Sequence, residues 1–233
     1  MMAAGAPSEF DWNKVQLVVF DVDGTLYRQS TLRRRMLQQL LLHAFLKADL
    51  KPLRILSAYR HIRESLAVAE TEGFEAILVS ETARQVACTT SVVDEVVSEW
   101  IYRRPLQYLA SCRYPFLSEL FCAIKRKKKI IGIFSDYPAK EKMQAMSLEA
   151  DYIVSAHDEG VGILKPHPRG LEILMRVAGV EPSKTVLIGD RLDRDGEAAL
   201  RAGVTPLIRT AKSYVGWRTF PAFEDRLFEP LLT

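Results

Sequence analysis

The sequence has 233 residues, of which 48% are hydrophobic and 26% are charged, with 32 basic and 29 acidic side chains. This composition supplies enough apolar surface for a folded core and excludes an intrinsically disordered chain. The formal net charge of +3 is too small to indicate a nucleic-acid-binding protein. We therefore expect no nucleic-acid partner, and other partners must be inferred from particular sites.

No pattern in the sequence indicates a membrane protein or an oxidising compartment. The first 14 residues lack a basic segment followed by an apolar run, and no stretch approaches the roughly 20 apolar residues that span a bilayer. The three cysteines, Cys88, Cys112 and Cys122, form no CxxC pair and cannot all pair with one another. We interpret them as reduced, as expected of a cytoplasmic protein without membrane contact.

Short apolar runs alternate with helix-like segments and predict a parallel sheet. The first run, residues 15–20 (VQLVVF), ends in Asp-Val-Asp-Gly, as expected of a strand that is buried on both faces. Alternation of strand and helix is typical of an α/β fold with a doubly wound, Rossmann-like sheet, in which functional groups gather at the carboxyl ends of the strands. The later predicted strands are residues 129–134, 152–154, 185–188 and 205–208.

A long segment without a convincing core strand, residues 26–128, separates the first two predicted strands. A structureless loop of this length is improbable, and much of the segment has the periodicity of amphipathic helices. We therefore predict an inserted, mainly helical domain at residues 29–103. The core domain is expected to comprise residues 1–28 and 104–233.

Two aspartates follow directly on the first predicted strand, in the sequence DVDGTL. Side chains two residues apart on an extended segment point the same way, so Asp21 and Asp23 are expected to project together beyond the sheet. Such a pair suits a hard cation such as Mg²⁺, and it also suits a nucleophile beside a general acid.

Polar side chains also stand at the ends of later strands or in nearby loops. Asp190 ends the run TVLIGD, where it could complete a cation site with Asp21, and Asp195 is a candidate for a further ligand or a supporting acceptor. Ser135 ends the second strand, where its hydroxyl and the N–H groups of a following helix could bind a phosphate oxygen. Lys165 supplies a positive charge.

These stretches together resemble the motifs of the haloacid dehalogenase (HAD) superfamily, in its phosphatase branch. The motifs occur in the order that the family uses: DVDGTL, a serine after an apolar strand, GxxKPxP and GDxxxxD. The resemblance covers about two-thirds of the chain, on both sides of the predicted insertion. The insertion resembles the helical cap that one subclass carries between its first and second motifs.

The resemblance implies a role for each acid. Asp21 would be the nucleophile that forms an aspartyl-phosphate, and Asp23 would act as general acid and then as general base. Asp21, the backbone carbonyl of Asp23, and Asp190 would hold Mg²⁺.

The resemblance also implies which residues hold the substrate. Ser135 and Lys165 would bind the transferring phosphoryl group. Asp195 would orient Lys165 or a metal-bound water, although Asp193 lies in the same acidic cluster and competes with it for this role.

The favoured function is Mg²⁺-dependent hydrolysis of a small phosphorylated metabolite. A phosphomutase of a sugar phosphate is an alternative, because it would use the same core residues. An alternative of a different class is a non-catalytic protein that keeps the fold and uses the helical domain as an interaction surface. Carbon–halogen cleavage is disfavoured, because that branch of the family lacks the second acid that Asp23 supplies here.

Overall fold

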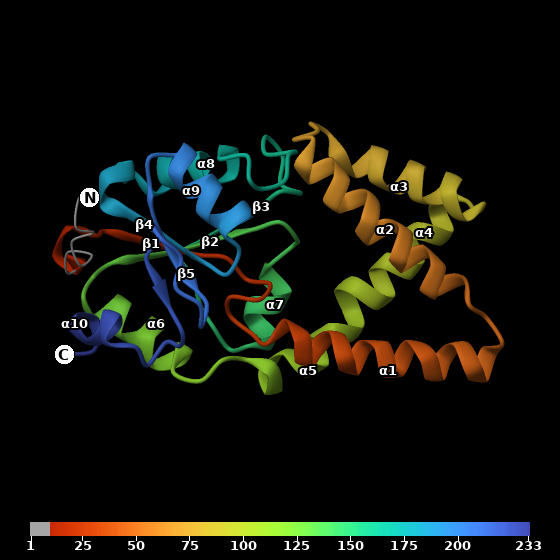
Figure 1. Ribbon diagram of the computed structural model, residues 1–233, viewed down its shortest axis with the longest axis horizontal. Helices are drawn as coiled ribbons and strands as arrows, with labels where there is room; N and C mark the ends of the chain where they lie inside the picture. The colour runs from red at the N-terminus through yellow and green to blue at the C-terminus, as the bar shows by residue number, and fades with distance from the viewer. Residues whose placement is uncertain (1–9) are drawn as a thin grey trace.

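A parallel sheet of six strands forms the centre of the structure, a computed structural model that describes residues 10–233 (Figure 1). The strand order is β3-β2-β1-β4-β5-β6, and each neighbouring pair is parallel. The predicted α/β class with a doubly wound sheet is therefore confirmed. The strands are β1 (Leu17–Phe20), β2 (Ile130–Ser135), β3 (Tyr152–Ser155), β4 (Thr185–Gly189), β5 (Thr205–Arg209) and β6 (Thr219–Phe220).

The central strand β1 is buried on both faces because helices cover both sides of the sheet (Figure 1). Val18 and Phe20 pack into one apolar cluster, whereas Leu17 and Val19 pack into another. This explains why the strand reads as an unbroken apolar run. The covering helices are α6 (Leu117–Arg126) and α10 (Glu229–Leu232) on one face, and α8 (Arg169–Ala178) and α9 (Glu197–Arg201) on the other.

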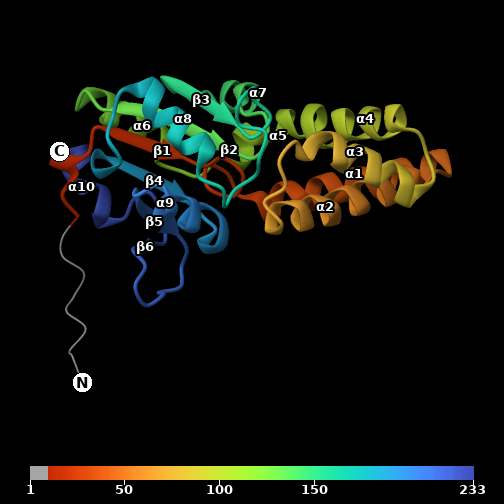
Figure 2. The same ribbon diagram turned by 90° about the horizontal axis from the view of Figure 1, so that it is seen from above.

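Most of the segment between β1 and β2 forms a group of helices that lies beside the sheet in both views (Figure 1, Figure 2). We call residues 29–112 the helical group. Its own apolar cluster includes Ile55, Phe74 and Leu78, which are fully buried. The helical group comprises α1 (Gln29–Lys47), α2 (Lys51–Val68), α3 (Phe74–Val86), α4 (Thr90–Val97), the π-helical turn η2 (Ser98–Arg103) and α5 (Arg104–Cys112).

The chain enters and leaves the helical group at one place. The backbone N–H of Arg28 donates to the carbonyl oxygen of Cys112 at 2.9 Å, and that of Tyr114 donates to the carbonyl oxygen of Leu26 at 3.0 Å. These bonds pair the two connecting segments in antiparallel fashion. The helical group is therefore anchored next to the carboxyl end of β1, where the predicted site begins.

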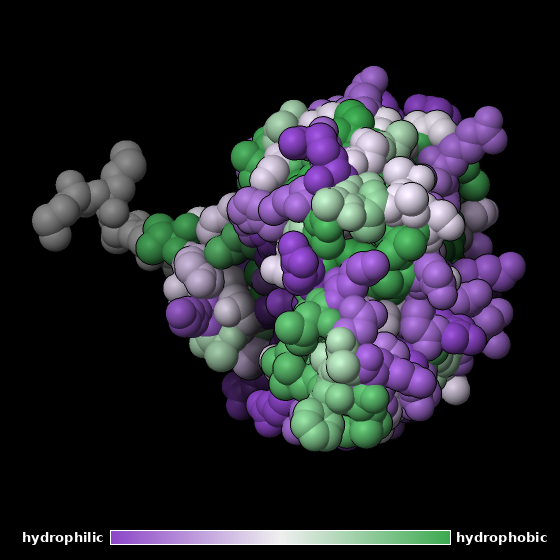
Figure 3. Space-filling view, turned by 90° about the vertical axis from the view of Figure 1, so that its right-hand side faces the viewer, coloured by the Kyte–Doolittle hydropathy of each residue, from purple (hydrophilic) through white to green (hydrophobic). Residues whose placement is uncertain are grey.

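Several apolar side chains of α1 are exposed. The far end of α1 is remote from the sheet (Figure 1). Figure 3 looks onto this end and shows apolar side chains in its lower part, where α1 lies. Among residues 10–233, no helix combines the length and apolarity needed to cross a bilayer. The exposed apolar residues of α1 are Leu37, Leu41, Leu42, Phe45 and Leu46.

The remaining short elements connect the layers of the core. None of the three cysteines forms a disulfide in the structure. The expected lack of a signal sequence concerns residues 1–14, most of which lie outside the described residues.

The short elements are α7 (Lys140–Ala145), η1 (Trp12–Lys14), η3 (Pro182–Lys184), η4 (Leu192–Gly196) and η5 (Arg226–Phe228).

The C-terminal segment packs back against the start of the chain through aromatic rings. Phe228 is fully buried, and its ring lies 4.9 Å from that of Phe220 and 5.7 Å from that of Trp12, between centroids. The indole N–H of Trp12 donates to the carbonyl oxygen of Leu227 at 2.6 Å. The last residues are thus part of the core rather than a free tail.

We expect Phe228→Ala to lower the free energy of unfolding by about 3–5 kcal/mol, because it leaves a cavity in a packed aromatic cluster. Urea unfolding followed by circular dichroism measures this change. Val215→Ala is the matched control: Val215 is fully exposed in the same segment, and its truncation should change stability by less than about 0.5 kcal/mol. An equal effect of the two substitutions would contradict the packing described here.

Candidate active site

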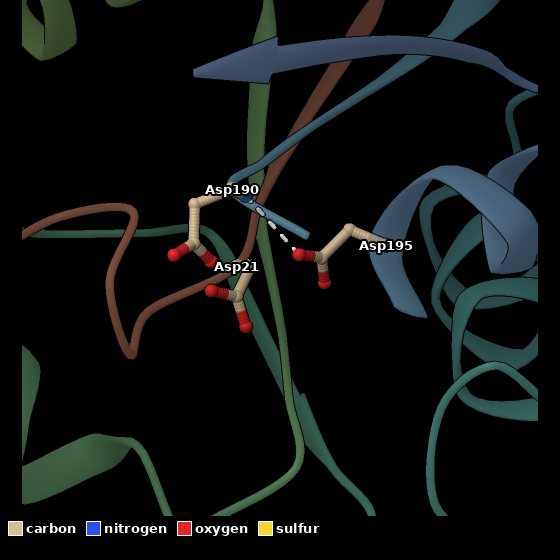
Figure 4. Close-up of side chains that lie close together, drawn as sticks. All are labelled: Asp21, Asp190 and Asp195. Atoms are coloured by element: carbon tan, nitrogen blue, oxygen red, sulfur yellow. Dashed lines mark hydrogen bonds between the residues drawn. The ribbon is translucent and has the colours of Figure 1, made fainter. Parts of the chain in front are cut away.

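The acids predicted to act together lie at the carboxyl ends of two neighbouring strands. Asp21 follows β1 and Asp190 follows β4, and the backbone N–H of Asp21 donates to the carbonyl oxygen of Ile188 at 2.9 Å. One carboxylate oxygen from each of Asp21, Asp190 and Asp195 lies within 4.8 Å of the other two (Figure 4). Segments about 170 residues apart in the sequence thus form one acidic cluster.

Lys165 is buried within this cluster and bridges two of its acids. Its ammonium donates to Asp21 Oδ1 and to Asp195 Oδ1, each at 2.6 Å. Only 2% of the residue is exposed. Burial disfavours the charged lysine, but the two carboxylates outweigh it and raise the pKa of Lys165 above its ordinary value. The lysine is therefore a fixed cation beside Asp21.

Asp195, rather than Asp193, belongs to the site. Its second oxygen accepts hydrogen bonds from the backbone N–H groups of Asp190, at 3.2 Å, and Arg191, at 3.1 Å. Asp195 therefore has both oxygens engaged and holds Lys165 against the strand-end turn. Asp193 instead points outward, with 66% of its side chain exposed, and pairs with Arg191. The π-helical turn η4 separates these neighbouring acids onto opposite sides.

Thr25 and Gly24 complete the surroundings of Asp21. The buried hydroxyl of Thr25 donates to Asp21 Oδ2 at 2.9 Å, so the nucleophile candidate is held through both oxygens. Gly24 has a φ of 109°, and a Cβ there would lie only 2.3 Å from Asp190 Oδ2. Glycine is therefore required both for the turn and for the close approach of Asp190. Both residues belong to the DVDGTL motif, but the motif alone does not predict that the Thr25 hydroxyl donates to Asp21.

The acidic cluster carries more negative charge than its lysine neutralises. Burial and the nearby Asp195 raise the pKa of Asp190 to about 6. Burial also raises the pKa of Asp21, together with the charges of Asp195 and Asp190, although Lys165 opposes this. Within residues 10–233, the carboxylate of Asp190 accepts a hydrogen bond only from the Thr25 hydroxyl, at 3.5 Å. Carboxylates in this state suit a hard divalent cation, and the donor set fits one.

The carboxylate of Asp23 lies outside the acidic cluster and has different partners. Lys142, on α7, contacts both of its carboxylate oxygens, at 2.6 and 2.7 Å, and the hydroxyl of Tyr27 also donates to it. Burial alone would raise the pKa of Asp23, but Lys142 and Tyr27 outweigh burial and hold it below its ordinary value. Asp23 is therefore held as a carboxylate. The sequence analysis missed Lys142, because nothing in its neighbourhood along the chain marks it.

Ser135 stands at the end of β2 but does not reach the cavity wall in this structure. It is fully buried, and its hydroxyl oxygen accepts a hydrogen bond from the backbone N–H of Tyr137 at 3.2 Å. The neighbouring Asp136 accepts a hydrogen bond from the backbone N–H of Lys165 at 2.9 Å, which ties the loop of Lys165 to β2. Phosphate binding by Ser135 remains a prediction.

A cavity of about 350 Å³ lies between the acidic cluster and the helical group. Glu64 of α2 spans its edge, pairing with Arg191 at 3.0 Å and with Arg194 at 2.7 Å. The core side contributes Asp21, Asp23, Lys142, Lys165, Asp190 and Asp195. The helical side contributes Arg33, Arg60, Arg63, Trp100 and Tyr102, among others.

A family model described as haloacid dehalogenase-like hydrolase matches residues 15–203, which include all the site residues described above. The chain belongs to the haloacid dehalogenase-like hydrolases. This confirms the family that the sequence motifs indicate, and with it the prediction of a hydrolase.

Individual proteins resemble this HAD hydrolase in sequence or in fold. It is 26% identical to a glyceraldehyde 3-phosphate phosphatase of Methanopyrus kandleri, over 85% of each chain. The HAD-hydrolase YfnB of Bacillus subtilis, in a magnesium-bound structure, has a TM-score of 0.67 at 13% identity, covering 93% of this chain and 98% of its own. A 2-haloacid dehalogenase of Pseudomonas syringae has a TM-score of 0.63 at 18% identity, covering 89% and 94%. The two structures share the fold.

We expect the metal-free HAD hydrolase to lose stability as pH rises from about 4 to about 6. The folded state raises the pKa of Asp190 from 3.8 to about 6, so the folded protein binds the proton more tightly, and this stabilisation disappears above the folded pKa. Asp190→Asn should flatten the profile and be more stable than the unsubstituted chain at pH 7. Urea unfolding at several pH values in the presence of chelator measures both effects.

Added Mg²⁺ provides the second half of this test. It should stabilise the unsubstituted chain at pH 7 and have little effect on Asp190→Asn, because only the former keeps the free carboxylate. Identical pH profiles, or equal stabilisation by Mg²⁺, would contradict the charge distribution assigned to this cluster.

Proposed function

We propose that this HAD hydrolase is a Mg²⁺-dependent phosphatase of a small phosphorylated metabolite, with Asp21 as its nucleophile. The observation that carries the proposal is the position of Asp21 between Lys165, 2.6 Å away, and the loosely bonded carboxylate of Asp190. A carboxylate placed between a fixed cation and a metal-binding group can approach a phosphate dianion. The phosphatase activity of the Methanopyrus kandleri relative supports the same reaction class.

The proposed first step transfers the phosphoryl group to the enzyme. An oxygen of Asp21 attacks phosphorus, the bond between phosphorus and the ester oxygen breaks, and the leaving alkoxide takes a proton from Asp23. Lys165 stabilises the charge on the phosphoryl oxygens. Thr25 and Lys165 hold the attacking carboxylate in place before the substrate arrives.

The proposed second step regenerates the enzyme. A water molecule attacks the aspartyl-phosphate and gives its proton to Asp23, so that phosphate leaves and Asp21 is free again. The carboxylate form of Asp23, held by Lys142, is the form that this second step requires. For the first step Asp23 must carry a proton, so Lys142 has to shift part of its contact to a phosphoryl oxygen or to the leaving group.

Asp21, Asp190 and the backbone carbonyl of Asp23 would hold the Mg²⁺ ion. When bound, this ion neutralises the nucleophile and the phosphoryl oxygens so that two anions can meet. Asp195 has both oxygens engaged by Lys165 and by backbone N–H groups, so we assign it to the support of Lys165 rather than to the metal. Ser135 is proposed to bind a phosphoryl oxygen once its hydroxyl no longer accepts the hydrogen bond from the backbone N–H of Tyr137.

Residues 29–103 are proposed to act as a cap domain over a core formed by residues 1–28 and 104–233. Supporting this division, Glu64 of α2 pairs with Arg191 and Arg194 of the strand-end turn, so the helical side closes the edge of the cavity. A cavity of about 350 Å³ is near the lower end for small-molecule sites, which favours a small metabolite over a polymer.

We expect Asp21→Asn to reduce kcat for phosphate release by at least about a thousandfold, because the amide is not a nucleophile. Chelator should abolish the activity of the unsubstituted chain, and Mg²⁺ should restore it. Asp193→Asn makes the same chemical change at an exposed acid outside the site and should leave the rate unchanged. Phosphate release from a panel of phosphorylated metabolites is the measurement.

The products of the same assay test the alternatives. Conversion of a sugar phosphate into its isomer without phosphate release would favour a phosphomutase. Normal turnover by Asp21→Asn would remove the proposed mechanism, and partner binding that depends on the helical group would then favour a non-catalytic role.

We expect Asp23→Asn to separate the two steps. For alkyl phosphates, kcat should fall by about a hundredfold or more, because the leaving alkoxide receives no proton. With p-nitrophenyl phosphate, whose leaving group departs without protonation, a burst of nitrophenolate equal to the enzyme concentration should precede slow turnover. Stopped-flow absorbance measures the burst. Absence of the burst with p-nitrophenyl phosphate, together with an equal loss of kcat for both substrates, would contradict the general-acid role.

A further inference from the structure

Three arginines of the helical group line the cavity without a carboxylate partner. Arg33 lies on α1, and Arg60 and Arg63 lie on α2. Within the described part of the chain, none of the three forms an ion pair. Arg191 and Arg194 line the same cavity, yet both pair with Glu64. The unpaired charge is thus confined to the helical side.

Arg63 is the most buried of the three and has spare hydrogen-bonding capacity. Only 7% of it is exposed, its guanidinium lies 3.7 Å from the centre of the Tyr137 ring, and one of its NH₂ groups donates to the carbonyl oxygen of Asp136 at 2.5 Å. Its Nε–H is buried and has no acceptor. Leaving a buried donor unsatisfied costs free energy, so a ligand that supplies an acceptor to this N–H group would be favoured.

Arg33 and Arg60 add two further positive charges to the helical side of the cavity. Partial burial lowers the pKa of Arg60, and the charge of Arg33 adds to this effect, so the two guanidiniums repel one another. An anion between them would convert this repulsion into attraction. Guanidinium groups suit carboxylate and phosphate in particular, because their donors match two oxygens at once.

We propose that Arg33, Arg60 and Arg63 bind a second anionic group of the substrate, either a carboxylate or a second phosphate. This inference rests on the proposed function, in which Asp21 and Lys165 receive the phosphoryl group that is transferred. The small cavity limits the distance between the two anionic ends, so the substrate is a short metabolite that is charged at both ends.

Binding of two non-hydrolysable compounds tests the arginine site without turnover. 3-Phosphonopropionate and its carboxamide have the same size and phosphonate group, and they differ in one negative charge. We expect the carboxylate to bind at least tenfold more tightly by calorimetry in Mg²⁺ at low salt, with a smaller difference at high salt. Equal affinities would overturn the inference.

Substitutions assign the preference to particular residues. Arg33→Gln and Arg60→Gln change exposed side chains, so the fold should be retained, and each should reduce the tenfold preference to about threefold or less. Arg34→Gln is the matched control, since Arg34 adjoins Arg33 on α1 but does not line the cavity. Loss of the preference in Arg34→Gln as well, or its retention in both cavity variants, would contradict the assignment.

Turnover separates this inference from the proposed function. 3-Phosphoglycerate and glyceraldehyde 3-phosphate differ at one end, where a carboxylate replaces an aldehyde, and we expect a tenfold or larger advantage in kcat/KM for the former. Turnover of both compounds at equal kcat/KM would contradict the proposed anion site but support the proposed phosphatase activity. Preferential binding of 3-phosphonopropionate without phosphate release from any ester would contradict the proposed phosphatase activity but support the proposed anion site.

Discussion

The buried ion pairs of Lys165 hold the site together. Its ammonium joins Asp21 at the end of β1 to Asp195 in the turn after β4, and its backbone is tied to Asp136 after β2. One residue thus links three strand ends, two through its side chain and the third through its backbone N–H. One ammonium faces three carboxylates when Asp190 is included, so two negative charges remain, which is the charge that a divalent cation neutralises.

The helical group is coupled to the same lysine through Arg194. This arginine donates to the carbonyl oxygen of Lys165 at 2.8 Å and pairs with Glu64 of α2. The helix that carries Arg60 and Arg63 is therefore positioned by a contact that also supports the loop of Lys165. A shift of α2 would alter both walls of the cavity, so Arg194 contributes to the distance between the two proposed anion positions.

The sequence predicted the parts of the site that depend on local pattern. Asp21, Asp190 and Lys165 stand at strand ends or in a motif loop, and parallel strands bring such positions together whatever the rest of the chain does. Lys142 was missed because α7 meets Asp23 only through tertiary packing. The sequence named Asp195 with Asp193 as its competitor, and the turn η4 directs Asp195 inward and Asp193 outward.

The distribution of charge in the cavity would link the proposed binding of substrate to that of a metal ion. A phosphate dianion beside Asp21 and Asp190 meets two carboxylates and one lysine, so repulsion opposes its entry until a cation neutralises the acids. The unpaired arginines on the helical side attract the other end of a doubly charged substrate whether or not the cation is present. In the proposed function they would retain such a molecule in the cavity, and its phosphoryl end would enter once a cation neutralises the acidic cluster. The cation and the substrate would then favour each other's binding.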